Sequence, residues 1–136
     1  MTAFPLPLVL RAFAPEEVAS AETDRQLYQL REEFRFVSAE FGEIVVPIGF
    51  ITDFASIPRA ALWYVDDDDP VILFASVIHD YLYTRRGDLG LGTRVTFTRE
   101  DADRVLREAM LLCGARRAQA WVVYSAVRLG GGSHWK

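Results

Sequence analysis

The stretch "VILFASVIHDYLYTRR", residues 71–86, decides the fold, because it is apolar over most of its length and directly follows Pro70. Proline suits the first turn of a helix, and no helix-breaking residue occurs before Gly87. At about 100° per residue, the polar residues of this helix share one arc, while apolar residues fill most of the circumference. We therefore predict a buried helix with one polar strip, formed by Ser76, His79, Asp80 and Tyr83.

A buried polar strip needs partners, because polar groups removed from water must be hydrogen-bonded. On the next predicted helix, Asp103 lies close in angle to Leu106 and Met110, so it borders the packed face. A carboxylate bonded to one imidazole nitrogen fixes the tautomer and raises the basicity of the other nitrogen, as a general base for water requires. We predict that His79 and Asp103 form such a dyad. The alternative is a buried histidine whose bonds are purely structural.

A second acidic group lies upstream, in the segment "GFITDFASIPR", residues 49–59. This tight run is able to direct the Asp53 carboxylate and neighbouring backbone carbonyls toward one point. Carboxylates and carbonyls together are the ligands of a hard cation, above all calcium. The alternative is an Asx-turn that leads into a proline-started helix, with Ser56 as its N-cap.

The rest of the chain divides into a strand-rich part and a helical part. Alternating aromatic and β-branched residues predict antiparallel strands in 27–38 and 43–50, and a weaker pattern predicts a strand in 6–13. Residues 14–26 suit a short helix or a loop. Thr98 and Asp101 form a capping-box variant that opens a helix ended by Gly114. A last helix is predicted from helical spacing of Ala118, Trp121, Val122, Ser125, Ala126 and Leu129.

This order predicts an α+β fold, with a short antiparallel β-sheet in the first half followed by three helices. We expect one domain over residues 1–136. Its strand-rich part covers residues 1–50, its helical core with the polar site covers 51–131, and a frayed tail, 132–136, includes His134 and Trp135.

Composition excludes several classes of function. The net charge of -4 comes without a basic cluster, which argues against nucleic acid as a partner. A single cysteine excludes an internal disulfide framework. The first residues lack a cationic start and are shorter than the roughly 20 apolar residues that span a bilayer, so we expect neither signal peptide nor transmembrane segment. Phosphate-binding loops, zinc-ligand spacings and a Gly-x-Ser-x-Gly elbow do not occur in the sequence.

The segments "VPIGFITDFASIPR", "VIHDYLY", "ADRVLREAM" and "VVYSAVRLGG" occur in this order. Over roughly residues 28–131 the chain resembles a family common in tailed bacteriophages and prophages, known as domain of unknown function 1353. The resemblance implies a phage or prophage origin and carries no established activity. It also implies synthesis in the host cytoplasm and, for a packaged protein, presence in the virion beside other virion proteins.

The His-Asp-x-x-Tyr motif, the aspartate on the following helix and the closing "YSAVRLGG" helix also look like the helical core of phospholipases A2. That resemblance implies that His79 activates water, that Asp103 orients His79 and that Tyr83 supports the dyad. It implies a calcium site formed by Asp80, Asp53 and the backbone carbonyl of Phe54. The chain differs from that family in having one cysteine and no Gly-rich calcium loop.

The first expectation is therefore a phage-derived, calcium-dependent ester hydrolase of the phospholipase A2 type, acting on phospholipid or at a membrane surface. One alternative is a non-catalytic virion component, such as a tail or baseplate subunit, in which the polar cluster is a structural network. A second alternative is a cell-wall amide hydrolase with zinc on His79 and aspartates, although catalytic zinc sites usually use two or more nitrogen or sulfur ligands.

Overall fold

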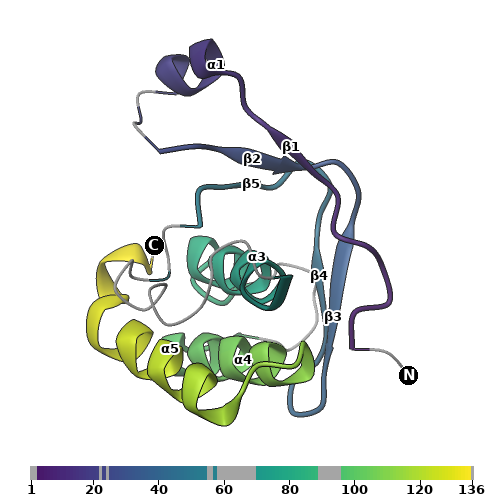
Figure 1. Cartoon of the computed structure of the whole chain (residues 1–136), viewed down its shortest axis with the longest axis vertical. Helices are drawn as coiled ribbons and strands as arrows, with labels where there is room; N and C mark the ends of the chain where they lie inside the picture. The colour runs from purple at the N-terminus through teal and green to yellow at the C-terminus, as the bar shows by residue number, and fades with distance from the viewer. Residues whose placement is uncertain are drawn as a thin grey trace. The chain divides into compact units, whose positions relative to one another are not determined.

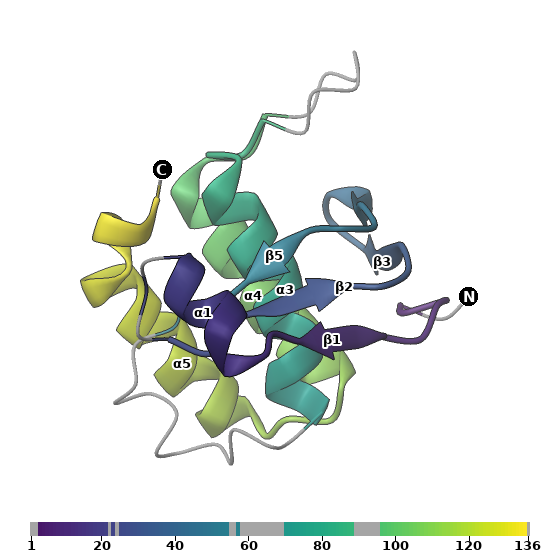
Figure 2. The same ribbon diagram turned by 90° about the horizontal axis from the view of Figure 1, so that it is seen from above.

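The computed structural model describes residues 3–21, 23, 25–54, 57, 70–88 and 96–135. The chain forms two compact units, Met1–Asp53 and Phe54–Lys136, and each is described by itself. Short antiparallel strands occupy the first unit and three helices occupy the second (Figures 1 and 2). The α+β prediction is confirmed.

The first unit contains two small antiparallel sheets. One has the strand order β1-β2-β5, formed by Leu10–Ala12, Tyr28–Leu30 and Ile51–Thr52. The other is a hairpin of β3, Phe34–Ser38, and β4, Gly42–Val46. Of the antiparallel pairing expected between residues 27–38 and 43–50, the part formed by β3 and β4 is present, with a turn between them. Strand β2 pairs instead with β1 and β5 in the other sheet.

The β3–β4 hairpin follows directly from the period-two pattern of its sequence. Phe34 pairs with Val46 and Phe36 pairs with Ile44, and these four side chains are buried. Alternate residues of a strand point to opposite faces, so both strands place their apolar residues on one face. The ring of Phe4 stacks on that of Phe34, with 5.7 Å between ring centroids.

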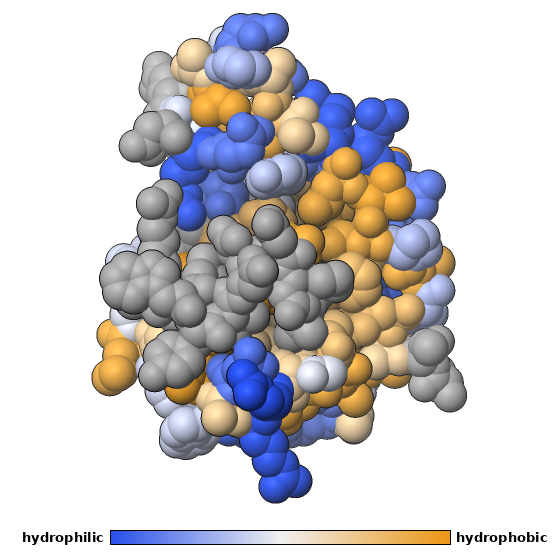
Figure 3. All heavy atoms as spheres, viewed as in Figure 1, coloured by the Kyte–Doolittle hydropathy of each residue, from blue (hydrophilic) through white to orange (hydrophobic). Residues whose placement is uncertain are grey.

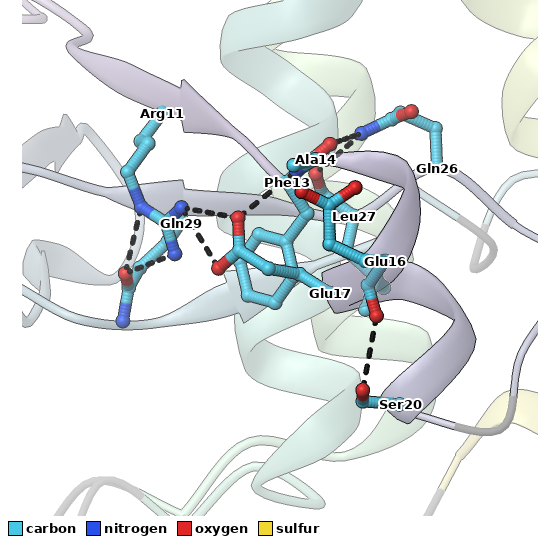
Figure 4. Close-up of polar contacts among 9 residues, drawn as sticks. All are labelled: Arg11, Phe13, Ala14, Glu16, Glu17, Ser20, Gln26, Leu27 and Gln29. Carbon is cyan, nitrogen blue, oxygen red and sulfur yellow. Dashed lines mark hydrogen bonds and ion pairs between the residues drawn. The ribbon is translucent and has the colours of Figure 1, made fainter.

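A short helix, α1, Pro15–Ser20, connects β1 to β2. Arg11 on β1 donates to both carboxylate oxygens of Glu17, at 3.0 and 3.1 Å, and to Oε1 of Gln29 on β2 (Figure 4). Glu17 also accepts a hydrogen bond from the backbone N–H of Ala14. Arg11 therefore joins α1 to both neighbouring strands.

The second unit contains α3, Pro70–Thr84, α4, Arg99–Leu112, and α5, Arg117–Gly130. Helix α4 packs against both α3 and α5 (Figure 1). From Ile72 to Tyr83, every α3 residue is buried or half-buried, as the sequence predicts for this helix. A helix apolar nearly all round is stable only in such surroundings.

Gly87 follows the end of α3, at a position where no side chain fits. Its φ is +78°, and a Cβ atom there would lie 1.8 Å from the carbonyl oxygen of Phe97. The N–H of Phe97 donates to the Gly87 carbonyl at 2.9 Å. The end of α3 is thus joined to the residues that precede α4.

Helix α4 begins as predicted. The Thr98 hydroxyl accepts from the Asp101 N–H at 3.0 Å, and the Asp101 carboxylate accepts from the Thr98 N–H at 3.0 Å. These bonds satisfy two backbone donors, which stabilises the first turn. Gly114 follows the end of α4 with a φ of +102°, as expected for a helix stop.

Helix α5 is also present, but the residues whose spacing predicted this helix do not form its buried face. The buried residues are Ala120, Val123 and Val127, whereas Trp121 is 58% and Leu129 is 90% exposed. Helical spacing in an apolar segment shows that a helix forms but does not choose between overlapping faces.

The predicted tail contains a short turn and an aromatic contact. Gly132–His134 form a 3-10 turn, η1, and the ring of Trp135 contacts that of Tyr83 edge-on, with 5.2 Å between centroids. An aromatic contact of this kind stabilises the end of the described chain.

Apolar side chains are visible on the surface (Figure 3). Among the described residues, the large exposed ones are Ile48, Ile51, Leu111, Leu112, Trp121 and Leu129. Within the described ranges, no helix is long and apolar enough to cross a membrane.

Candidate functional site

The predicted polar strip lies inside the second unit, where α3 faces α4. His79 and Tyr83 are one turn apart on α3, and Asp103 is in the second turn of α4. The side chains of His79 and Asp103 are both 0% exposed. Tyr83 is likewise buried, so these three polar groups need hydrogen-bond partners inside the protein.

His79 and Asp103 are within hydrogen-bond distance, as the sequence predicts. Nε2 of His79 lies 2.7 Å from Oδ1 of Asp103. An ionised carboxylate only accepts hydrogen bonds, so Nε2 carries the proton and donates it. This bond fixes the ring orientation and its tautomer.

Tyr83 supports the same carboxylate oxygen. Its hydroxyl donates to Oδ1 of Asp103 at 2.5 Å, and its ring lies 4.2 Å from the His79 ring, centroid to centroid. Burial, together with the bond to Asp103, raises the pKa of the Tyr83 hydroxyl far above its ordinary value. The hydroxyl therefore stays protonated and remains a donor.

Asp103 has a third partner that the sequence did not reveal. Nη1 of Arg128, on α5, donates to Oδ2 of Asp103 at 2.8 Å. Tyr124, four residues before Arg128 in the sequence, also acts on the Arg128 guanidinium electrostatically, and its ring lies under the guanidinium of Arg107, at 4.5 Å. A buried carboxylate usually requires a cation as well as neutral donors, which predicts such a partner without identifying it.

These partners decide the charge of Asp103. Burial alone would raise the pKa of this carboxyl, but hydrogen bonds from His79, Tyr83 and Arg128 together hold the pKa below its ordinary value. The bond to Asp103 in turn raises the pKa of the Arg128 guanidinium. The centre is thus an ionised aspartate that accepts from an imidazole, a phenol and a guanidinium.

The residues expected to bind a cation lie in different parts of the chain. Asp80 is buried on α3, one residue after His79, so it projects about 100° away around the helix. Asp53 belongs to the first unit, where its Oδ2 lies 3.4 Å from Nε of Arg25. Phe54 begins the second unit with a φ of +59°, which is uncommon for a residue other than glycine. Residues 55, 56 and 58–69, including Ser56, lie outside the described part.

No group of three or more His, Cys, Asp or Glu side chains suited to a metal ion occurs within the ranges that the structure describes. The contacts of Asp103 form a hydrogen-bonded dyad with His79 and two supporting donors, Tyr83 and Arg128. Its chemistry is that of a histidine whose orientation is set by an ionised carboxylate.

Comparison with known proteins agrees with the motifs. A search of curated proteins found no match, and a search of solved structures found none either. A family model described as "Protein of unknown function (DUF1353)" matches residues 28–127, which include α3, α4 and most of α5. Because this match covers more than half of the chain, the chain belongs to the DUF1353 family of proteins of unknown function.

Proposed function

We propose that the protein is a hydrolase in which His79 takes a proton from water that attacks an ester carbonyl. The observation that supports the proposal is the 2.7 Å contact between His79 Nε2 and Asp103 Oδ1. Because Nε2 faces Asp103, Nδ1 is the ring atom that would accept the proton. Asp103 would stabilise the imidazolium that forms, while remaining ionised itself.

His79 would take part in the reaction only by accepting and donating a proton. Water loses a proton to Nδ1 as its oxygen bonds to the ester carbonyl carbon, and the carbonyl oxygen becomes an oxyanion. The oxyanion then collapses, the bond to the alcohol oxygen breaks, and the alcohol leaves with the proton held by His79. Tyr83 and Arg128 would keep Asp103 aligned throughout.

A calcium ion would stabilise the oxyanion in the phospholipase A2-like version of this proposal. Asp80 would be one ligand, and Asp53 and the Phe54 carbonyl would be others. The ion would have to compete with Arg25, which lies 3.4 Å from the Asp53 carboxylate. Calcium binding is therefore a separate part of the proposal, with its own test.

The proposed substrate is a lipid ester, and the proposed setting is a phage or prophage. Both rest on the resemblances of "VIHDYLY" and its companion segments. Other virion proteins and the membrane surface would be the partners.

Hydrolysis of a short-chain phospholipid and of a simple aryl ester tests the catalytic proposal. We expect His79→Asn to lose at least about 100-fold in rate, because general-base catalysis contributes about 10²- to 10⁴-fold. His134→Asn is the matched control, since His134 is the only other histidine in the chain. Equal activity of His79→Asn and wild type, or no activity in wild type, would reject the hydrolase.

Calorimetric titration with calcium tests the cation. We expect binding by wild type and by Glu108→Gln, whose substitution removes a charge from the partly exposed side of α4. Asp80→Asn should bind much more weakly. If wild type binds no calcium, or Asp80→Asn binds as wild type does, the proposed ligand set is wrong.

The second candidate is a non-catalytic component of a phage particle, in which the same residues form a structural network. The full burial of His79 and Asp103 favours it, because water and substrate must reach a catalytic ring. Arg128 favours it as well, since a guanidinium already balances the charge of Asp103. This candidate predicts a large loss of stability in Asp103 variants and no hydrolysis by wild type.

A further inference from the structure

Arg99 occupies a position that its own helix does not favour. It is the first residue of α4, at the end where the helix dipole is positive. Its guanidinium instead donates to the carbonyls of Val127 and Arg128 in the last turn of α5, both at 3.0 Å. Carbonyls at a helix C-terminus lack helical donors and attract cations. Arg99 thus joins the start of α4 to the end of α5.

The guanidinium of Arg99 donates hydrogen bonds to two of the three residues that contact Asp103. Nη1 of Arg99 donates to the hydroxyl oxygen of Tyr83 at 3.4 Å, and this hydroxyl donates to Asp103. Nη2 holds the backbone of Arg128, whose side chain reaches the other carboxylate oxygen. The two backbone bonds are the shorter ones, so they contribute most to the position of Arg99.

Gly131 shows how closely these groups approach one another. A Cβ atom at this position would lie 2.6 Å from the Val127 carbonyl oxygen, 3.0 Å from the Tyr83 hydroxyl and 3.4 Å from Nη1 of Arg99. Gly131 is itself buried. The absence of a side chain here lets the end of α5 close around the contact between Arg99 and Tyr83.

We propose that Arg99 is a positioning residue of the His79–Asp103 dyad, because it fixes Tyr83 and Arg128 on the two oxygens of Asp103. A role of Arg99 in catalysis rests on the proposed function. The alignment of Tyr83 and Arg128 on Asp103 by Arg99 does not depend on that function. A planar guanidinium suits this role, since it donates to several acceptors in fixed directions.

The test is the proton NMR resonance of the His79 Nε2–H, which reports the bond to Asp103. Arg99→Gln should shift this resonance, and Arg99→Lys should restore it in part. Thr98→Ala is the matched control: it weakens the start of α4 one residue away and leaves the contacts to Tyr83 and Arg128 in place. If Arg99→Gln unfolds, Arg99→Lys alone still tests the proposal.

A purely structural role predicts a different result. In that case both Arg99 variants and Thr98→Ala would lose stability while the His79 resonance stays at its wild-type position, which would overturn the proposal. An equal shift in Thr98→Ala would overturn it too. A shift confined to the Arg99 variants supports the proposal even where wild type hydrolyses no ester, because the resonance does not depend on turnover.

Discussion

Replacing Asp103 with asparagine removes the charge of the buried carboxylate and keeps its shape. Each hydrogen bond to a charged group contributes about 1.5–3 kcal/mol, and breaking a buried ion pair costs about 3–5 kcal/mol. The three donors act on one group, so their contributions do not add. The Arg128 side chain is 31% exposed, so water replaces part of the interaction that Arg128 loses with Asp103. We therefore expect Asp103→Asn to lower the free energy of unfolding by about 3 kcal/mol.

The loss of stability in Asp103→Asn should depend on pH, and the lowered pKa of Asp103 sets the direction of that dependence. The pKa of Asp103 is lowered in the folded protein, so the carboxylate stabilises the fold at pH values above its unfolded pKa, about 3.9. That contribution disappears as the pH falls through the lower, folded pKa. The difference between wild type and Asp103→Asn should hence shrink as the pH falls below about 4.

Urea unfolding followed by circular dichroism, repeated across this pH range, measures the difference. Glu32→Gln is the control, because it removes one charge from an exposed position and should change stability by less than about 0.5 kcal/mol. A loss below about 1 kcal/mol in Asp103→Asn would refute the reasoning. So would a difference that stays the same from pH 7 to pH 3.

Three further predictions concern single residues of the second unit. Tyr83→Phe removes a buried bond to Asp103 and should cost about 1.5 kcal/mol by thermal unfolding; an unchanged midpoint would contradict this. Gly87→Ala should cost more than Gly114→Ala, since both have positive φ but only Gly87 lacks space for a Cβ; equal losses in urea would show that sterics are unimportant there. Thr98→Ala should cost about 1 kcal/mol by the same assay, and no loss would mean that the cap contributes nothing.

Features that depend on nearby residues could be predicted from the sequence. The burial of α3, the cap at Thr98 and the β3–β4 hairpin follow from periodicity and from the residue types at helix ends and turns. The pairing of His79 with Asp103 was also predictable, because a buried imidazole and a carboxylate on the next packed helix have few other partners.

Features set by packing between distant segments could not be predicted. Arg128 contacts Asp103 only because α5 packs on α4, and the sequence offered Tyr124 as a nearer partner. The contact of Trp135 with Tyr83 likewise depends on where α5 ends. Arg99 did leave one signal, since a cation at the start of a helix opposes the dipole and indicates a partner elsewhere.

The ¹⁵N NMR spectrum of the His79 ring tests the central claim most directly. An ionised Asp103 accepts from Nε2, so the account predicts a ring that carries a proton on Nε2, coupled to a slowly exchanging N–H. The single other histidine, His134, is identified by its own variant. A neutral ring with its proton on Nδ1, or an Nε2–H that exchanges as fast as that of an exposed histidine, would contradict the dyad.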